Sequence, residues 1–117
     1  MSISAPKEST CDLQGTDVSN SDLAFLAALE TIIRERLENP AAGSYTARLF
    51  ASGKQRIAQK VGEEGVELAL ASVSGNREEV IDEAADLVYH LLVLLQAQDL
   101  ELGQVVARLE ERHADKP

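Results

Sequence analysis

In residues 54–97, KQRIAQKVGEEGVELALASVSGNREEVIDEAADLVYHLLVLLQA, two runs of apolar side chains recur every three or four positions. This is the spacing of one face of an α-helix. The runs are separated by Ser74-Gly75-Asn76, and Asn76 precedes Glu79 in the layout of a capping box with Asn in place of Ser or Thr. Because so short a connection joins antiparallel neighbours, the pattern predicts two packed helices, over about 54–73 and 77–97.

Weaker helical patterns lie upstream of this pair. Apolar residues at helical spacing predict a helix over about 22–38, with Ser21 or Asp22 as its N-cap and Asn39-Pro40 as its end. Residues 47–51 are long enough for one or two further helical turns before a glycine interrupts them. No strand pattern stands out in the chain.

The remaining segments set the expected limits of one folded domain, over residues 21–113. A last helix is predicted from Leu102 to about His113, followed by a charged tail over 114–117. Residues 1–20 are rich in Ser, Thr and Asp and lack the apolar stretch of a signal peptide, which predicts a disordered tail. The expected fold is therefore an all-α bundle of four to five helices.

Composition limits the partners that the protein is expected to have. Only two Phe, two Tyr and no Trp occur among 44% hydrophobic residues, so the core must be aliphatic. A net charge of −9 disfavours nucleic acid, and the longest apolar run, Leu91–Leu95, is too short to cross a membrane. The single cysteine, Cys11, allows no intrachain disulfide. We expect a cytoplasmic protein with neither a nucleic acid nor a membrane as partner.

Acidic side chains form a stripe on each of the two central helices. At about 100° per residue, five charged residues of the first fall within an arc of roughly 100°, and four polar residues of the second follow a similar strip. If the helices pack antiparallel, the two stripes can approach one another, and clustered carboxylates then favour a hard cation such as Mg²⁺ or Mn²⁺. The stripes consist of Arg56, Lys60, Glu63, Glu64 and Glu67, and of Glu79, Glu83, Asp86 and His90.

A simpler interpretation competes with each functional one. A lone pair of acids at helical spacing usually only solvates a helix face, and Arg56 and Lys60 are equally explained as ion-pair partners of nearby glutamates. A lone His90 on a mostly apolar helix is more often a packed or surface residue than a ligand or base. Gly62 and Gly65 each cost a helix roughly 1 kcal/mol relative to alanine, which suggests close approach of a neighbouring helix or a ligand.

The spacing of the acids also resembles a known signature. Glu63-Glu64-x-x-Glu67, fifteen intervening residues and Glu83-x-x-Asp86 resemble the motif of the all-helical MazG-type nucleotide pyrophosphohydrolases. Three flanking stretches are similar to the phosphoribosyl-ATP pyrophosphohydrolases of that superfamily, over about residues 23–113: SYTARLF (44–50), RIAQKVGEE (56–64) and EAADLVYHLL (83–92).

This resemblance implies an activity and a set of site residues. The activity is Mg²⁺-dependent hydrolysis of phosphoribosyl-ATP to phosphoribosyl-AMP and pyrophosphate, the second step of histidine biosynthesis, by a dimeric enzyme. Glu63 or Glu64 is the better candidate for the general base. The expected metal ligands are Glu63, Glu64, Glu67, Glu83 and Asp86, the candidate phosphate contacts are Lys54, Arg56 and Lys60, and the resemblance alone suggests Ser44, Tyr45 and Thr46 for the rest of the substrate.

Two other functions stay open on the sequence. A MazG-type house-cleaning hydrolase of ordinary or damaged nucleoside triphosphates would use the same metal ligands. A non-catalytic helical adaptor would use the broad apolar helix faces as oligomer surfaces, with the acids only solvating. Because helices apolar around most of their circumference are hard to bury in one small bundle, the sequence also predicts self-association as a two-fold dimer.

Overall fold

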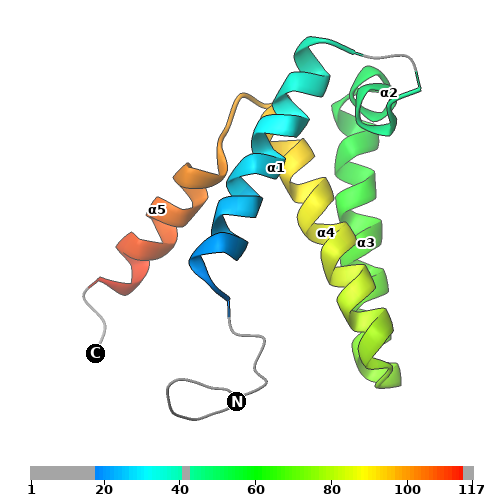
Figure 1. Cartoon of the computed structure of the whole chain (residues 1–117). Helices are drawn as coiled ribbons and strands as arrows, with labels where there is room; N and C mark the ends of the chain where they lie inside the picture. Colours follow the sequence, from blue (N-terminus) through cyan, green and yellow to red (C-terminus); the bar gives the residue numbers. More distant parts are fainter. Residues whose placement is uncertain (1–17, 41–42, 115–117) are drawn as a thin grey trace.

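Five α-helices make up residues 18–40 and 43–114, the part of the chain that the computed structural model describes (Figure 1). They are α1 (Asn20–Glu38), α2 (Tyr45–Ala51), α3 (Lys54–Ser74), α4 (Arg77–Ala97) and α5 (Leu102–His113). No strand occurs in these residues, so the predicted all-α fold of four to five helices is confirmed. The expectations for Cys11 and for most of both tails fall outside the described residues.

The first helix begins earlier than predicted because of its cap. The Ser19 hydroxyl accepts a hydrogen bond from the Asp22 backbone N–H at 3.1 Å, and the Asp22 carboxylate accepts one from the Ser19 N–H at 3.0 Å. This reciprocal capping box satisfies two backbone donors that the helix itself leaves free. The prediction of Ser21 or Asp22 as N-cap was therefore wrong, and Ser19 is the N-cap.

The central pair, α3 and α4, is the predicted antiparallel hairpin. Gly75 ends α3 in the left-handed conformation, with φ of +82°, and the Asn76 side chain starts α4 by accepting from the Glu79 N–H at 3.1 Å. The two helices run side by side from this turn and share the most extensive contact of any pair (Figure 1). Residues at equal distance from Gly75 therefore lie opposite one another.

The hydrophobic core lies at the end of this hairpin away from its turn. There α1 and α2 pack against the N-terminal part of α3 and the C-terminal half of α4, and α5 leads away beyond them (Figure 1). The buried aliphatic side chains of this core come from four helices and are Ile33, Leu49, Ile57, Leu92 and Val93. The turn end of the hairpin consequently projects as an arm that α1 and α2 do not cover.

The two glycines inside α3 have no close helical neighbour. A Cβ atom added at Gly62 or Gly65 would meet no described atom within 4 Å. Close approach of a neighbouring helix of the same chain is therefore the wrong explanation for them.

None of the described helices combines the length and the apolar character that crossing a membrane requires. The cytoplasmic location and the absence of a nucleic-acid partner stay predictions.

Candidate metal centre

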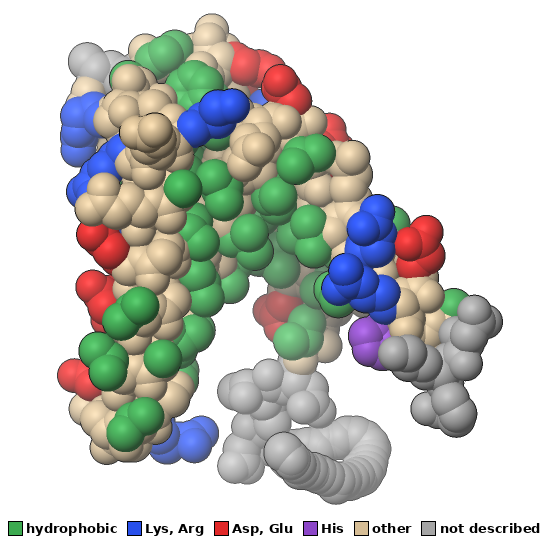
Figure 2. Space-filling view, turned by 180° about the vertical axis from the view of Figure 1, so that it is seen from behind, with side chains coloured by type: hydrophobic (Ala, Val, Ile, Leu, Met, Phe, Trp, Pro, Cys, Tyr) green, Lys and Arg blue, Asp and Glu red, His purple; other side chains and the backbone are tan. Residues whose placement is uncertain are grey.

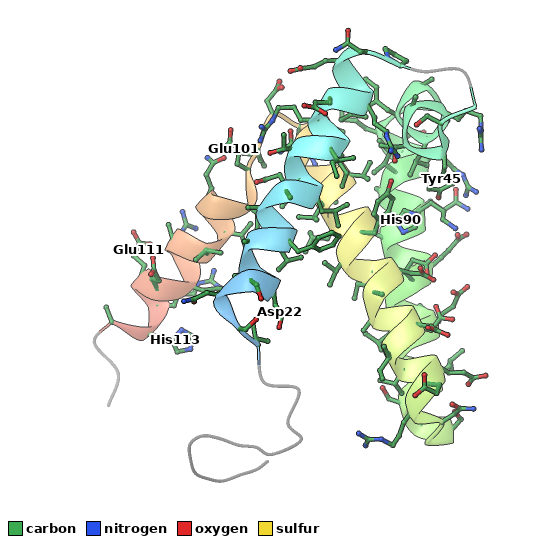
Figure 3. The ribbon with its side chains drawn as sticks, in the orientation of Figure 1. Asp22, Tyr45, His90, Glu101, Glu111 and His113 are labelled. Atoms are coloured by element: carbon green, nitrogen blue, oxygen red, sulfur yellow. The ribbon has the colours of Figure 1, made fainter. Side chains whose placement is uncertain are left out.

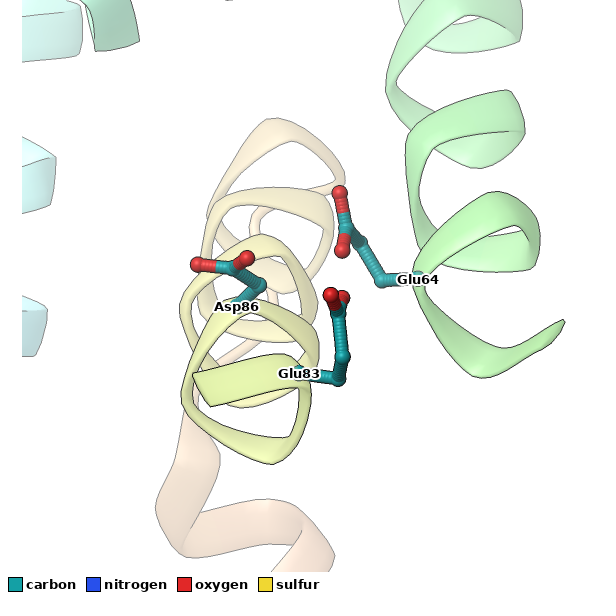
Figure 4. A group of neighbouring side chains, drawn as sticks. All are labelled: Glu64, Glu83 and Asp86. Atoms are coloured by element: carbon teal, nitrogen blue, oxygen red, sulfur yellow. The ribbon is translucent and has the colours of Figure 1, made fainter. Parts of the chain in front are cut away.

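Three carboxylates from the two central helices meet in one place. Glu64 lies on α3 and faces Glu83 and Asp86 on α4, and one carboxylate oxygen of each lies within 4.8 Å of the others (Figure 4). The hairpin register explains the meeting, because Glu64 and Asp86 are each eleven residues from Gly75. Glu83 joins them because residues three apart share a helix face. We call these three residues the carboxylate cluster.

Burial makes the cluster different from a solvated acidic face. Glu64 is only 5% exposed. The Oε1 atoms of Glu64 and Glu83 are both inaccessible to solvent, and neither has a hydrogen-bond partner among the described residues. A buried polar atom without a partner is costly, and a buried carboxylate oxygen especially so. A cation between the two helices would satisfy both atoms, and a site that offers only oxygen ligands suits hard divalent ions.

The electrostatics of Glu83 show how closely the acids are packed. Burial raises the pKa of Glu83 from its ordinary 4.5 to about 7, helped by a hydrogen bond with the Glu67 carboxyl and by the negative charges of Glu67, Glu64 and Asp86. Glu67 therefore reaches Glu83 from the neighbouring turn of α3, although its own side chain is exposed. Without a cation, the cluster holds its negative charge at a cost to the folded state.

This cost predicts how stability depends on pH when metal is removed. Because the pKa of Glu83 is higher in the folded chain than unfolded, its penalty is absent below about pH 4.5, grows as the pH rises and is complete above about pH 7. We expect Glu83→Gln to be more stable than the natural protein at pH 8 with EDTA, and the difference to vanish at pH 4.5. Urea unfolding at both pH values measures it.

The matched control for this prediction is Glu79→Gln, which neutralises an exposed glutamate one turn earlier on α4. Its stability relative to the natural protein should not follow the same pH window. If Glu83→Gln tracked the natural protein at every pH, the raised pKa would be wrong.

The other predicted ligand on α3, Glu63, points elsewhere. Its Oε2 accepts a hydrogen bond from Gln59 Nε2 at 2.8 Å, and its Oε1 lies 4.0 Å from both Arg56 Nη1 and Lys60 Nζ. The structure therefore brings Glu64, Glu67, Glu83 and Asp86 together and leaves Glu63 beside the basic residues. The physical reason is that consecutive helical residues differ by about 100° in direction.

The basic residues of the stripe act as ion-pair partners. Lys60 Nζ lies 3.4 Å from Glu64 Oε2. Burial lowers the pKa of Lys60, but a hydrogen bond with Glu64 and the proximity of Tyr45, Glu64 and Glu63 outweigh it, so the net pKa is raised. Among the residues that the structure describes, Arg56 pairs only with Glu63. The simpler interpretation of both residues thus describes the structure, while phosphate binding by them and by the exposed Lys54 stays a prediction.

Tyr45, Tyr89 and His90 form an aromatic group beside the cluster, and the sequence did not predict that these three rings meet. Tyr45 of α2 hydrogen-bonds to His90 Nε2 at 2.8 Å, and His90 Nδ1 hydrogen-bonds to the Asp86 carbonyl at 2.8 Å (Figure 3). Thr46 of α2 hydrogen-bonds to the Tyr89 hydroxyl in the same region. His90 is buried and packed, as the simpler interpretation expected. Its position four residues after Asp86 was the one signal that it borders the cluster.

Comparison with known protein families matches residues 26–113 to the family described as phosphoribosyl-ATP pyrophosphohydrolase. The chain belongs to this family. The family signature covers the whole of the α3–α4 hairpin, and with it the carboxylate cluster.

Similar proteins of this family carry the name histidine biosynthesis bifunctional protein HisIE. The one from Yersinia pestis is 59% identical over 93 residues, which are 80% of this chain and 46% of that protein. The one from Vibrio cholerae is 52% identical over 99 residues, 85% of this chain and 47% of that protein. The one from Campylobacter jejuni is 55% identical over 94 residues, 80% of this chain and 45% of that protein. The chain spans about half the length of these curated relatives.

Proposed function

We propose that this chain hydrolyses phosphoribosyl-ATP to phosphoribosyl-AMP and pyrophosphate in histidine biosynthesis, with Mg²⁺ held by Glu64, Glu83 and Asp86. The observation that carries the proposal is the pair of buried, unpartnered carboxylate oxygens inside a chain of this family. A bound cation would balance the charge of these carboxylates and give both oxygens a partner. Mn²⁺ offers the same oxygen chemistry and is the expected substitute.

Each acidic residue then has a separate task. Mg²⁺, when bound, neutralises the charge of the triphosphate and of the leaving pyrophosphate. Glu67 lies close enough to Glu83 to raise the pKa of that carboxyl, so its negative charge would add to the attraction for the cation. Glu63, which is 44% exposed and outside the cluster, can accept the proton of the water that attacks between the α and β phosphates. Glu64 is the alternative base, but it is only 5% exposed and belongs to the carboxylate cluster that would hold the cation.

The basic residues of α3 would contact the phosphates of the substrate. Lys60, Arg56 and Lys54 follow one another along α3 toward its N-terminus. They would supply positive charge to a chain whose net charge of −9 otherwise repels a triphosphate. The ion pair with Glu64 holds Lys60 beside the cluster before substrate arrives, and the ion pair with Glu63 holds Arg56 beside that glutamate.

A substrate panel tests the proposal against its enzymatic rival. Pyrophosphate release should be much faster from phosphoribosyl-ATP than from ATP or the deoxynucleoside triphosphates at equal concentration. Faster turnover of ordinary triphosphates would favour a house-cleaning hydrolase. No release from any of them would favour the adaptor.

We also propose that the chain forms a two-fold homodimer through the projecting arm. Large apolar side chains stay exposed on both of its helices, and Figure 2 shows hydrophobic side chains along this arm. An exposed apolar surface of this kind marks an interaction site. The residues are Val66, Leu70, Val73, Ile81 and Val88.

Sedimentation equilibrium checks the dimer. The natural chain should sediment at twice its mass of 12.6 kDa, and a Leu70→Asp/Ile81→Asp variant should shift toward the monomer while keeping its helical circular dichroism. A natural chain that stays monomeric at all concentrations would contradict the dimer.

A further inference from the structure

The first residue of α2 is fixed to α4 beside the carboxylate cluster. The Tyr45 hydroxyl and His90 Nε2 are 2.8 Å apart, and the two rings meet edge to face at 5.8 Å and 88°. The adjacent residues, Thr46 and Tyr89, make a second hydrogen bond between the same two helices. Two tyrosine hydroxyls therefore join α2 to α4: the Tyr45 hydroxyl contacts a histidine ring, and the Tyr89 hydroxyl contacts a threonine hydroxyl.

The tautomer of His90 fixes the direction of the first bond. A backbone carbonyl can only accept, so the 2.8 Å contact with the Asp86 carbonyl requires the hydrogen of His90 to be on Nδ1. In the neutral ring Nε2 is then an acceptor, and the Tyr45 hydroxyl must donate to it. The phenol oxygen keeps its lone pairs and can only accept from any other molecule. Tyr45 is 43% exposed, so another molecule can reach it.

His90 shows how near this oxygen lies to the cluster. Its Nε2 is 2.8 Å from the Tyr45 hydroxyl, and its Nδ1 is 2.8 Å from the backbone carbonyl of Asp86, a cluster residue. Tyr45 is therefore separated from the backbone of a cluster residue by a single imidazole ring. Phosphate oxygens offer no hydrogen for an acceptor at this position. The bond that is broken lies between the α and β phosphates, and the α-phosphate is attached to a ribose. The hydroxyls of this ribose are the hydrogen-bond donors of phosphoribosyl-ATP that lie nearest to that bond.

We propose that the Tyr45 phenol oxygen accepts a hydrogen bond from a hydroxyl of the ATP ribose, and that His90 is the positioning residue that keeps this oxygen an acceptor. The inference rests on the proposed function and names a contact of the same site. It makes Tyr45 a residue that contacts substrate, whereas Tyr89 only docks α2.

Two tyrosine-to-phenylalanine variants separate contact from docking. Tyr45→Phe should raise KM for phosphoribosyl-ATP by about fivefold to tenfold, the equivalent of one neutral hydrogen bond, with kcat within about twofold. Tyr89→Phe removes a hydroxyl from the same junction and should lower the melting temperature as much, with KM unchanged. An equal rise of KM in both variants would mean that the hydroxyls act only by packing α2 against α4. That result would contradict a direct contact between Tyr45 and the substrate.

The positioning part has its own pair of variants. His90→Gln keeps a carbonyl oxygen that can accept from Tyr45, whereas His90→Phe keeps only a ring. We expect His90→Phe to raise KM as Tyr45→Phe does and His90→Gln to restore most of the loss. If the two variants had the same KM, His90 would not be positioning Tyr45.

Binding without turnover keeps this test independent of the proposed reaction. The probes are α,β-methylene ATP and its 2′-deoxy and 3′-deoxy counterparts, measured by calorimetry with Mg²⁺. The natural protein should bind one deoxy analogue about fivefold more weakly than the parent, and Tyr45→Phe should bind both equally. Equal binding by the natural protein, or no binding, overturns the inference. If the natural protein distinguished the deoxy analogues but released no pyrophosphate from phosphoribosyl-ATP, only the proposed substrate would be wrong.

Discussion

Replacing Glu64 with glutamine should lower kcat for pyrophosphate release by at least about 10³-fold, because a metal ion contributes several kcal/mol to such a reaction. The amide keeps the size of the side chain but replaces one oxygen with a hydrogen-bond donor and removes the charge. Glu64 is buried with its Oε1 unpartnered, so the substitution alters an oxygen that is free to bind a cation. Asp86→Asn should have a comparable effect.

Folding must be intact for this result to bear on the metal site. The circular dichroism of Glu64→Gln should match the natural protein. Its melting temperature in EDTA should stay close to that of the natural protein, since the substitution removes like-charge repulsion but also the ion pair with Lys60. Asp82→Asn is the matched control for Asp86→Asn, because Asp82 is exposed on the same helix. Activity retained in Glu64→Gln would refute the assignment of the cluster.

Shortening Leu92 to alanine should destabilise the fold by about 2–5 kcal/mol, through lost apolar burial and the cavity that remains. Leu92 is 1% exposed and belongs to the core where α1, α2, α3 and α4 meet. For a domain of this size such a loss is a large part of the total stability. Urea unfolding at fixed protein concentration gives the free energy of unfolding directly.

Leu109→Ala provides the same chemical change at an exposed position, since Leu109 is 50% exposed on α5. Its cost should stay within about 0.5–1 kcal/mol. Equal losses for the two leucines would place the core elsewhere.

The helical hairpin could be predicted from sequence because its signals are local. Gly75 and Asn76 end one helix and start the next, and this turn fixes which residues lie opposite one another. That register was enough to bring Glu64 and Glu67 to Glu83 and Asp86. The cap of α1 was misplaced for an equally local reason, because Ser19 and Asp22 form a reciprocal pair that the apolar pattern alone does not reveal.

The details that could not be predicted depend on side-chain direction and on distant parts of the chain. Glu63 and Glu64 share a stripe in the sequence, yet only Glu64 turns into the interface with α4. The hydrogen bond between Tyr45 and His90 joins residues 45 positions apart in the sequence. It depends on how α2 packs against α4, which no local sequence pattern predicts. Helical phase gives the face of a residue, whereas burial and pairing come from packing.

Dependence on Mg²⁺ is the most direct test of a metal-assisted hydrolysis at the carboxylate cluster. Pyrophosphate release from phosphoribosyl-ATP should be measured with the natural chain in Mg²⁺, after removal of metal with EDTA, and after Mg²⁺ is restored in excess. We predict release that is lost with EDTA and recovered with Mg²⁺, and no recovery in Glu64→Gln. Equal rates of release with and without Mg²⁺ would contradict the account.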